Sequence, residues 1–201
     1  MRPYTRTGDN GTSSLYNGER CKKNDIVFNI IGTIDELNSF LALLIVSMKT
    51  CDYATFTPTQ RGLFERTLKF LRFTQCCLFD LGSHVATPSG RKVQNVTFPC
   101  KALLKVVEQE IDILTDECPP LKNFVLMGDN FRETYSHICR TICRRVERQM
   151  VDCPDYCVGS SKYINRLSDY FFSVARFLTF NENDEVKIYK PCSEFLLGRL
   201  L

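Results

Sequence analysis

Three arginines follow one another at four-residue spacing in the second half of the chain: Arg140, Arg144 and Arg148. In an α-helix this spacing places them on one face. An apolar stripe is predicted roughly opposite, formed by Ile138, Ile142, Val146 and Met150. Guanidinium groups are always charged and match the geometry of phosphate oxygens. The pattern therefore predicts either an anion-binding helix face or an ordinary solvated basic face.

Two neighbours of these arginines extend the charged pattern. Arg145 adds a further positive charge, and Glu147 follows Arg144 by three residues. On a helix, residues three apart are neighbours. Glu147 is therefore expected to hold the Arg144 guanidinium in one orientation.

The N-terminal segment from 3 to 25 is rich in glycine and hydroxyl side chains. Its glycine, threonine and serine residues include Thr5, Thr7, Gly8, Gly11, Thr12, Ser13, Ser14 and Gly18. Backbone N–H groups in such a loop can converge on an anion, and Lys23 at its end can add a point charge. The P-loop pattern is missing. Taken alone, the segment fits a phosphate loop or an ordinary turn.

Polar residues elsewhere give weaker signals. Asn165 and Asp169 share a helical face by four-residue spacing. An asparagine here could recognise the ribose or the base of a nucleotide. Alternatively, both residues could have a purely structural role in the helix. His84 and His137 are far apart and lack ligand spacing, so neither is expected to bind a metal.

Five helices are expected to position these residues. The first is predicted over 34–50, with Thr33 and Glu36 as a capping box. Prolines and caps set the limits of the next two: the second helix is predicted from Thr57-Pro58 to before Pro88, and the third from Phe98-Pro99 to Cys118-Pro119-Pro120. The fourth and fifth helices are predicted over about 131–151 and about 159–180. No convincing strand is present. The pattern predicts an all-α, five-helix bundle with a ferritin-like up-down arrangement.

Length and composition favour one ordinary globular domain. The 201 residues are expected to form a single domain over 1–201, with an N-terminal loop at 1–25, a helical bundle at 26–190 and a C-terminal tail at 191–201. The net charge of +3 gives no strong field that demands nucleic acid or a membrane.

The cysteines and the apolar runs point to a reducing, aqueous compartment. The eleven cysteines are odd in number and include no Cys-x-x-Cys pair, so free thiols are expected. No apolar run approaches the ~20 residues that span a bilayer. No signal peptide is expected from the first residues. A cytoplasmic location is predicted, or the mitochondrial matrix if a presequence was removed.

Four motifs in a fixed order carry a family resemblance. They are Tyr4 to Gly11, Gly32 to Asn38, Cys143 to Arg148 and Asn165 to Tyr170. Together they resemble the ATP:cob(I)alamin adenosyltransferases of the propanediol-utilisation type, and the similarity runs from about residue 3 to residue 189.

The resemblance implies a homotrimer that binds ATP between neighbouring subunits. The N-terminal loop of one subunit and the arginine helix of the next would hold the nucleotide, with Mg²⁺ on its phosphates. The implied ATP-binding residues are Thr5, Arg6, Thr7, Gly8, Ser13, Ser14, Lys23, Arg144, Arg145, Glu147, Arg148 and Asn165.

The implied reaction is attack of cobalt(I) on the 5′ carbon of ATP, which forms a cobalt–carbon bond and releases triphosphate. The implied catalytic residues are Arg144, Phe124, Asp35 and Arg140, of which the last three would also bind cobalamin. Phe124 would fill the lower face of the corrin. Asp35 would pair with Arg140. A reductase or an acceptor mutase is a possible protein partner, whereas nucleic acid and membrane are not expected.

The chain departs from the family pattern in two places. The family usually has Phe-x-Leu-Pro followed by two glycines, whereas this chain has the run from Phe124 through Met127-Gly128-Asp129 to Asn130. Asn10 replaces a common lysine.

Two other function classes remain open. The altered loop motivates a non-catalytic carrier of corrinoid or nucleotide. The arginines from Arg140 to Arg148 motivate an RNA-binding helical protein, although interleaved aromatics and a recognised module are missing.

Overall fold

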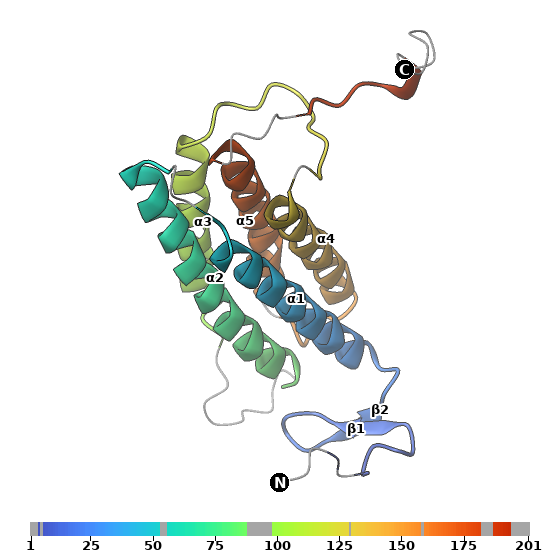
Figure 1. The fold of residues 1–201 in the computed structure, drawn as a ribbon. Coiled ribbons are helices and arrows are strands. Elements are labelled where there is room, and N and C mark those ends of the chain that lie inside the picture. Colours follow the sequence, from blue (N-terminus) through green and yellow to red (C-terminus); the bar gives the residue numbers. More distant parts are fainter. Residues whose placement is uncertain are drawn as a thin grey trace.

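Five long helices form the body of the protein. The computed structural model describes residues 4, 6–52, 56–87, 98–128, 130–157, 159–181 and 187–193. The helices are α1 (Ile26–Lys49), α2 (Pro58–Val85), α3 (Cys100–Asp116), α4 (Phe131–Val151) and α5 (Ser160–Asn181). Figure 1 shows them running alongside one another as a bundle. The predicted all-α five-helix architecture is confirmed.

The packing order places α4 and α5 at the centre of the bundle. The α4 helix packs mainly against α5 and α1, while α3 packs against α5 and α1 packs against α2. The predicted apolar stripe of α4 largely faces this core, since Ile142, Val146 and Met150 are buried. The opposite, arginine-bearing face is consequently left toward the surface.

The first helix begins eight residues earlier than predicted. Asp25 is its N-cap, and the carboxylate accepts a hydrogen bond from the Val27 amide at 3.1 Å. The predicted capping box at Thr33 is wrong, because the Thr33 hydroxyl lies within the helix and donates to the Asn29 carbonyl at 2.7 Å. The buried Val27 and Ile30 continue the helical apolar stripe toward the N-terminus, so the helix extends back to Asp25.

The other helix limits agree closely with the sequence. Thr57 and Gln60 make both hydrogen bonds of a capping box, and Pro58 opens α2. The α4 helix has the predicted bounds, and α5 is offset by one residue at each end. Pro88 and residues 194–201 of the predicted tail lie outside the described residues.

The prediction that the chain has no strand is wrong. A small antiparallel hairpin pairs β1 (Thr12–Ser14) with β2 (Arg20–Lys22), in a register that sets Ser14 opposite Arg20. Strands of three residues are too short to show the alternation by which a sequence reveals a strand. Figure 1 shows the hairpin beside the N-terminal end of α1.

The α1 helix is more apolar than expected. Its 24 residues have a window of mean hydropathy 1.6, so by length and composition it would be able to cross a membrane. The expectation that no apolar run approaches this length therefore fails for α1, whose polar residues are mostly uncharged. In the bundle, α1 packs against α2 and α4 and buries nine of its residues.

All eleven cysteines are free thiols, as expected. Cys139 and Cys143 on α4 are fully buried, and burial raises the pKa of the Cys143 thiol well above its ordinary value. Cys76 and Cys192 are exposed instead. Most of the cysteines thus serve as small core or near-core residues.

Candidate functional site

The N-terminal loop is organised by an arginine that the sequence did not reveal as important. The Arg20 guanidinium donates to the Thr7 carbonyl at 2.7 Å, to the Ser14 hydroxyl at 3.4 Å and to the Thr12 hydroxyl. Arg20 reaches all three because the hairpin register sets β2 beside β1. Because the sequence does not predict the hairpin, it does not predict these hydrogen bonds of Arg20 either.

Two of the predicted phosphate-binding residues meet inside this loop. A Cβ atom added at Gly8 would lie 3.1 Å from the Lys23 ammonium nitrogen. The Lys23 amide also donates to the Gly11 carbonyl at 2.9 Å. The ammonium group therefore lies directly against the glycine backbone, and any side chain at this position would crowd it.

The remaining residues of the first motif are less well defined. Arg6 has a φ of 58°, in the left-handed region, and its guanidinium lies 5.6 Å from the centre of the Tyr4 ring. Thr5 lies outside the described residues.

A hollow brings together residues predicted for different ligands. It has a volume of about 630 Å³ and lies between β1, α1 and α2. Ser13 and Ser14, predicted for ATP, line it together with Asp35, predicted for cobalamin. The Oδ1 atom of Asn38, also in the lining, is buried and has no hydrogen-bond partner among the described residues. The hollow is of the size that small-molecule sites require.

The basic face of α4 is only partly neutralised. Arg145 pairs with Glu36 of α1. Arg144 and Arg148 are exposed, and within the described part of the chain no ion pair involves either of them. Two neighbouring guanidinium groups without a carboxylate partner are suited to bind an anion.

The turn after α4 lies beside the N-terminal hairpin. The pKa of Tyr156 in that turn is raised by burial and then by the charges of Asp25, the N-cap of α1, and of Cys21 in β2. The basic end of α4 and the N-terminal loop thus occupy the same end of the molecule, as Figure 1 also shows.

Glu147 and Asn165 form a polar link between α4 and α5. The Asn165 amide donates to Glu147 Oε1 at 2.8 Å, and both side chains are half-buried. The predicted contact of Glu147 with Arg144 stays a prediction. Asp169 is occupied elsewhere, because it pairs with Arg166 at 2.9 Å.

Phe124 lies in an extended segment that crosses the far end of the bundle. Its side chain is 84% exposed. The Phe124 carbonyl accepts from the Tyr189 amide at 2.8 Å, and the Leu126 amide donates to the Lys187 carbonyl at 2.7 Å. The backbone of this segment is therefore fixed while the aromatic ring is left free. Neighbouring exposed apolar side chains are Leu126, Met127 and Phe131.

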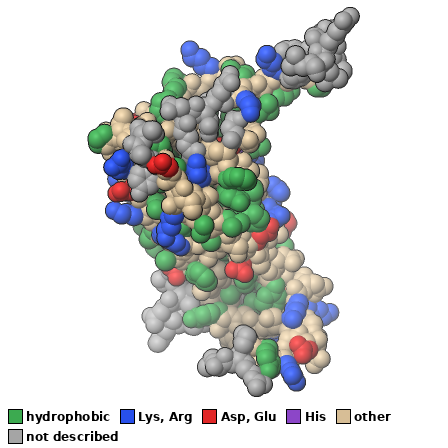
Figure 2. All heavy atoms as spheres, in the orientation of Figure 1, with side chains coloured by type: hydrophobic (Ala, Val, Ile, Leu, Met, Phe, Trp, Pro, Cys, Tyr) green, Lys and Arg blue, Asp and Glu red, His purple; other side chains and the backbone are tan. Residues whose placement is uncertain are grey.

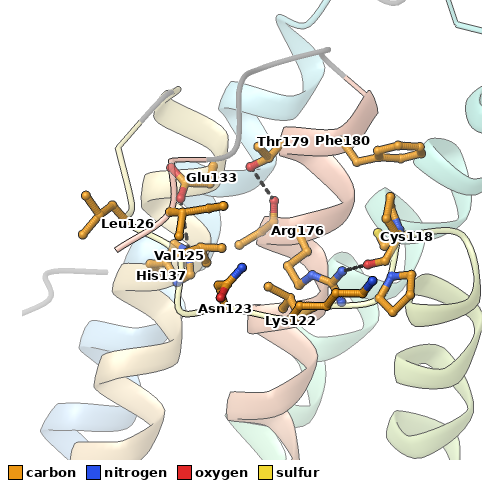
Figure 3. A pocket seen from close by; sticks show the side chains of 15 residues that line it. Cys118, Lys122, Asn123, Val125, Leu126, Glu133, His137, Arg176, Thr179 and Phe180 are labelled. Carbon is orange, nitrogen blue, oxygen red and sulfur yellow. Dashed lines mark hydrogen bonds and ion pairs between the residues drawn. The ribbon is translucent and has the colours of Figure 1, made fainter. Parts of the chain in front are cut away.

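A cavity of about 270 Å³ lies behind this segment (Figure 3). Glu133 and His137 of α4 line one side and Arg176, Thr179 and Phe180 of α5 line another. The Arg176 guanidinium donates to the Pro119 carbonyl, which ties the segment to α5. The cavity is mainly apolar, with few convergent polar groups.

Arg140 has other partners than the predicted one within the chain. Its Nε donates to His137 Nδ1 at 3.3 Å, and an Nη atom lies 3.9 Å from the Met127 sulfur. Burial, and then the charge of Arg144, lower the pKa of Arg140. Asp35 lies exposed on α1. The pair of Asp35 with Arg140 stays a prediction.

Two functional candidates escaped the sequence reasoning. Glu133 and His137 are buried one turn apart and contact each other at 3.2 Å. Their four-residue spacing is visible in the sequence, but their role depends on the loop that folds over them. Among the described residues, no cluster of three His, Cys, Asp or Glu side chains could hold a metal ion.

Comparison with known proteins agrees with this arrangement. The cobalamin adenosyltransferase family model matches residues 3–178. The corrinoid adenosyltransferase MMAB of Homo sapiens is 38% identical over 193 residues, which cover 92% of this chain and 72% of that protein. The corrinoid adenosyltransferase of Bacillus subtilis is 37% identical over 179 residues, or 88% and 86% of the two chains.

A solved structure shares both the fold and the family. It is a variant of the PduO-type ATP:corrinoid adenosyltransferase of Lactobacillus reuteri, complexed with cobalamin and ATP. The TM-score is 0.79 at 28% identity, with 94% of this chain and all of that chain covered. The arginine-lined α4, the glycine-rich hairpin loop and these matches together establish that the chain belongs to the cobalamin adenosyltransferase family.

Proposed function

We propose that the protein transfers the 5′-deoxyadenosyl group of ATP to the cobalt of cob(I)alamin, with adenosylcobalamin and triphosphate as products. The observation that carries the proposal is the exposed pair Arg144 and Arg148, which lack a carboxylate partner in the described chain. Membership of the family and the corrinoid adenosyltransferases among its relatives support it.

On the nucleotide side, the residues would bind and orient the triphosphate. Arg144 and Arg148 supply paired N–H donors, and the Lys23 ammonium group at Gly8 supplies a point charge. Cobalt(I) attacks the 5′ carbon, a cobalt–carbon bond forms, and the carbon–oxygen bond to triphosphate breaks. Since negative charge gathers on the departing triphosphate, fixed cations stabilise the transition state.

Asn165 and Glu147 would act beside the arginines. Their hydrogen bond at 2.8 Å fixes both side chains on adjacent helices. A fixed amide next to the basic face is suited to contact the nucleoside, which would set the 5′ carbon toward the cobalt.

On the corrin side, Phe124 would cover the lower face of the ring. Its exposed side chain on a backbone held by two hydrogen bonds supports this role. An aromatic ring in that position keeps water and a lower axial base away from cobalt, and it leaves the upper face to ATP. Asp35 and Arg140 would complete the corrin site.

A homotrimer would bring these groups together. Leu43 and Val46 on α1 and Phe79 on α2 are exposed, and Figure 2 shows hydrophobic side chains on the face that carries these helices. Phe79 also lines the hollow with Ser13 and Asp35. We propose that a second copy covers this face, that its α4 reaches the nucleotide held by the first copy's loop, and that Asp35 and Arg140 pair across the interface.

The proposed reaction also needs a metal ion, a compartment and protein partners. The Mg²⁺ would be held by the phosphate oxygens of ATP. The protein would work in the cytosol or the mitochondrial matrix, without nucleic acid or membrane. A reductase would supply cobalt(I), and a mutase would accept the product.

The test is to mix the purified protein with ATP and chemically reduced cobalamin and to follow the absorbance of adenosylcobalamin. Product at a rate above that of the protein-free control is expected. Tight binding of corrinoid and nucleotide without product would identify a carrier instead. Strong, salt-dependent RNA binding with indifference to ATP would point to the RNA-binding class.

A further inference from the structure

A buried carboxylate on α4 holds the segment that carries Phe124. Glu133 is only 4% exposed, although it lies in the first turn of the helix. Its Oε2 accepts from the Gly128 amide at 2.8 Å, and its Oε1 contacts His137 Nε2 at 3.2 Å. A carboxylate is costly to bury unless both oxygens have partners, so these contacts are what permits Glu133 to occupy the site.

The chain of contacts continues through His137 to Arg140. His137 Nδ1 accepts a hydrogen bond from Arg140 Nε at 3.3 Å. Since Nδ1 accepts, it carries no proton, and the imidazole is neutral with its proton on Nε2, toward Glu133. Burial and the charge of Arg140 lower the pKa of His137 to about 4, in agreement with this tautomer.

The contacts begin and end on the same loop. Glu133 binds the amide of Gly128, while the Arg140 guanidinium lies against the sulfur of Met127. Gly128 has a φ of 113°, a backbone conformation that glycine adopts far more readily than other residues. The turn after Leu126 therefore has both a residue suited to its shape and an anchor from α4.

The loop is held from its other side by the C-terminal segment. Val125 and Ile188 form an antiparallel bridge. Figure 3 shows Glu133 and His137 pointing toward each other from α4, with Val125 and Leu126 of the loop nearby. Phe124 itself is exposed, so packing of its own ring does not set its position. Its position is set by the two contacts that hold the backbone of the loop, from Glu133 to Gly128 and from Ile188 to Val125.

We infer that Glu133, His137 and Arg140 form a positioning relay that fixes the Phe124–Gly128 loop and so sets where the Phe124 ring meets the corrin. The last part of this inference rests on the proposed function, in which Phe124 covers the lower corrin face. Glu133 and His137 are positioning residues, because they act through the loop rather than on the substrate.

The test compares Glu133→Ala with Glu110→Ala as a matched control. Glu110 is also a buried glutamate that contacts a side chain of another residue, here the Arg66 guanidinium at 2.7 Å, but it lies on α3. Loss of the Glu133 carboxylate is expected to raise amide exchange at Gly128 by about 10- to 150-fold, as for one lost charged hydrogen bond. It is also expected to slow adenosyl transfer by about 10- to 100-fold, as for other supporting contacts around a site, with ATP affinity unchanged. Glu110→Ala is expected to leave both the exchange at Gly128 and the rate of adenosyl transfer unchanged.

A second variant separates positioning from misfolding. Glu133→Gln keeps one oxygen for the Gly128 amide but cannot also accept from His137 Nε2. Amide protection at Gly128 should therefore be largely rescued, and turnover should lie between wild type and Glu133→Ala.

Three outcomes are decisive. Unchanged exchange at Gly128 in Glu133→Ala would overturn the relay, whatever the turnover. Raised exchange with wild-type turnover would show that the relay holds the loop without positioning Phe124, and would overturn the inference. A wild type that makes no adenosylcobalamin would refute the proposed function, while the exchange measurement would still decide the contact.

Discussion

Replacing Arg144 by alanine should weaken ATP binding without weakening the fold. Arg144 is exposed, and no ion pair in the described chain involves it, so its removal breaks no known internal contact. Surface changes of that kind alter the free energy of unfolding by less than about 0.5 kcal/mol. The loss of one charged hydrogen bond to phosphate costs about 1.5–3 kcal/mol. The dissociation constant for ATP should rise by about 10- to 150-fold.

Isothermal titration of ATP into the wild type and the variant measures this effect. Arg72→Ala is the matched control, because Arg72 is an exposed arginine on α2 whose guanidinium donates to Gln75 Oε1 at 2.9 Å and takes part in no ion pair within the described residues. It removes the same charge from another place, and ATP affinity should not change. An unchanged affinity in Arg144→Ala, or an equal loss in Arg72→Ala, would refute a specific triphosphate site on α4.

Three further predictions test the rest of the account. Phe124→Ala should keep its ATP affinity but turn over slowly in the adenosylcobalamin assay, and an unchanged rate would exclude the proposed role at the corrin. Co-expressed Lys23→Ala and Arg144→Ala subunits should regain about one active site in four if each site joins two subunits, whereas a site within one subunit would regain none. The pKa of His137 is lowered from 6.5 to about 4 in the folded protein, so on acidification the imidazole takes up its proton in the unfolded chain before it does so in the folded one. The free energy of unfolding, measured by urea titration, should therefore fall by about 2 kcal/mol from pH 7 to pH 5. An equal fall in the free energy of unfolding in His137→Gln would contradict its assignment to His137.

The sequence predicted the elements whose limits are set by local chemistry. The start of α2 depends on Thr57, Pro58 and Gln60 alone, and the structure has the predicted capping box there. The start of α1 was misplaced because Thr33 and Glu36 fit a capping box locally, whereas the tertiary fold extends the helix to Asp25. Local rules cannot rank two possible caps when burial of Val27 and Ile30 decides between them.

The site was predictable only where its residues share one helix face. The spacing of Arg144 and Arg148 placed them correctly on the exposed side of α4. The organising role of Arg20 depends on a hairpin too short to predict, and the contact of Glu133 with Gly128 depends on how a loop folds over a helix. Such long-range geometry leaves no periodic signal in the sequence.

The most direct test of the account is the spectrum of bound cob(II)alamin with and without ATP. If the nucleotide and the corrin share one site and Phe124 displaces the lower ligand, a four-coordinate cobalt signal should form only when ATP is present. It should be reduced in Phe124→Ala. A five-coordinate signal that is the same with and without ATP would contradict the claim that this chain brings the two substrates together.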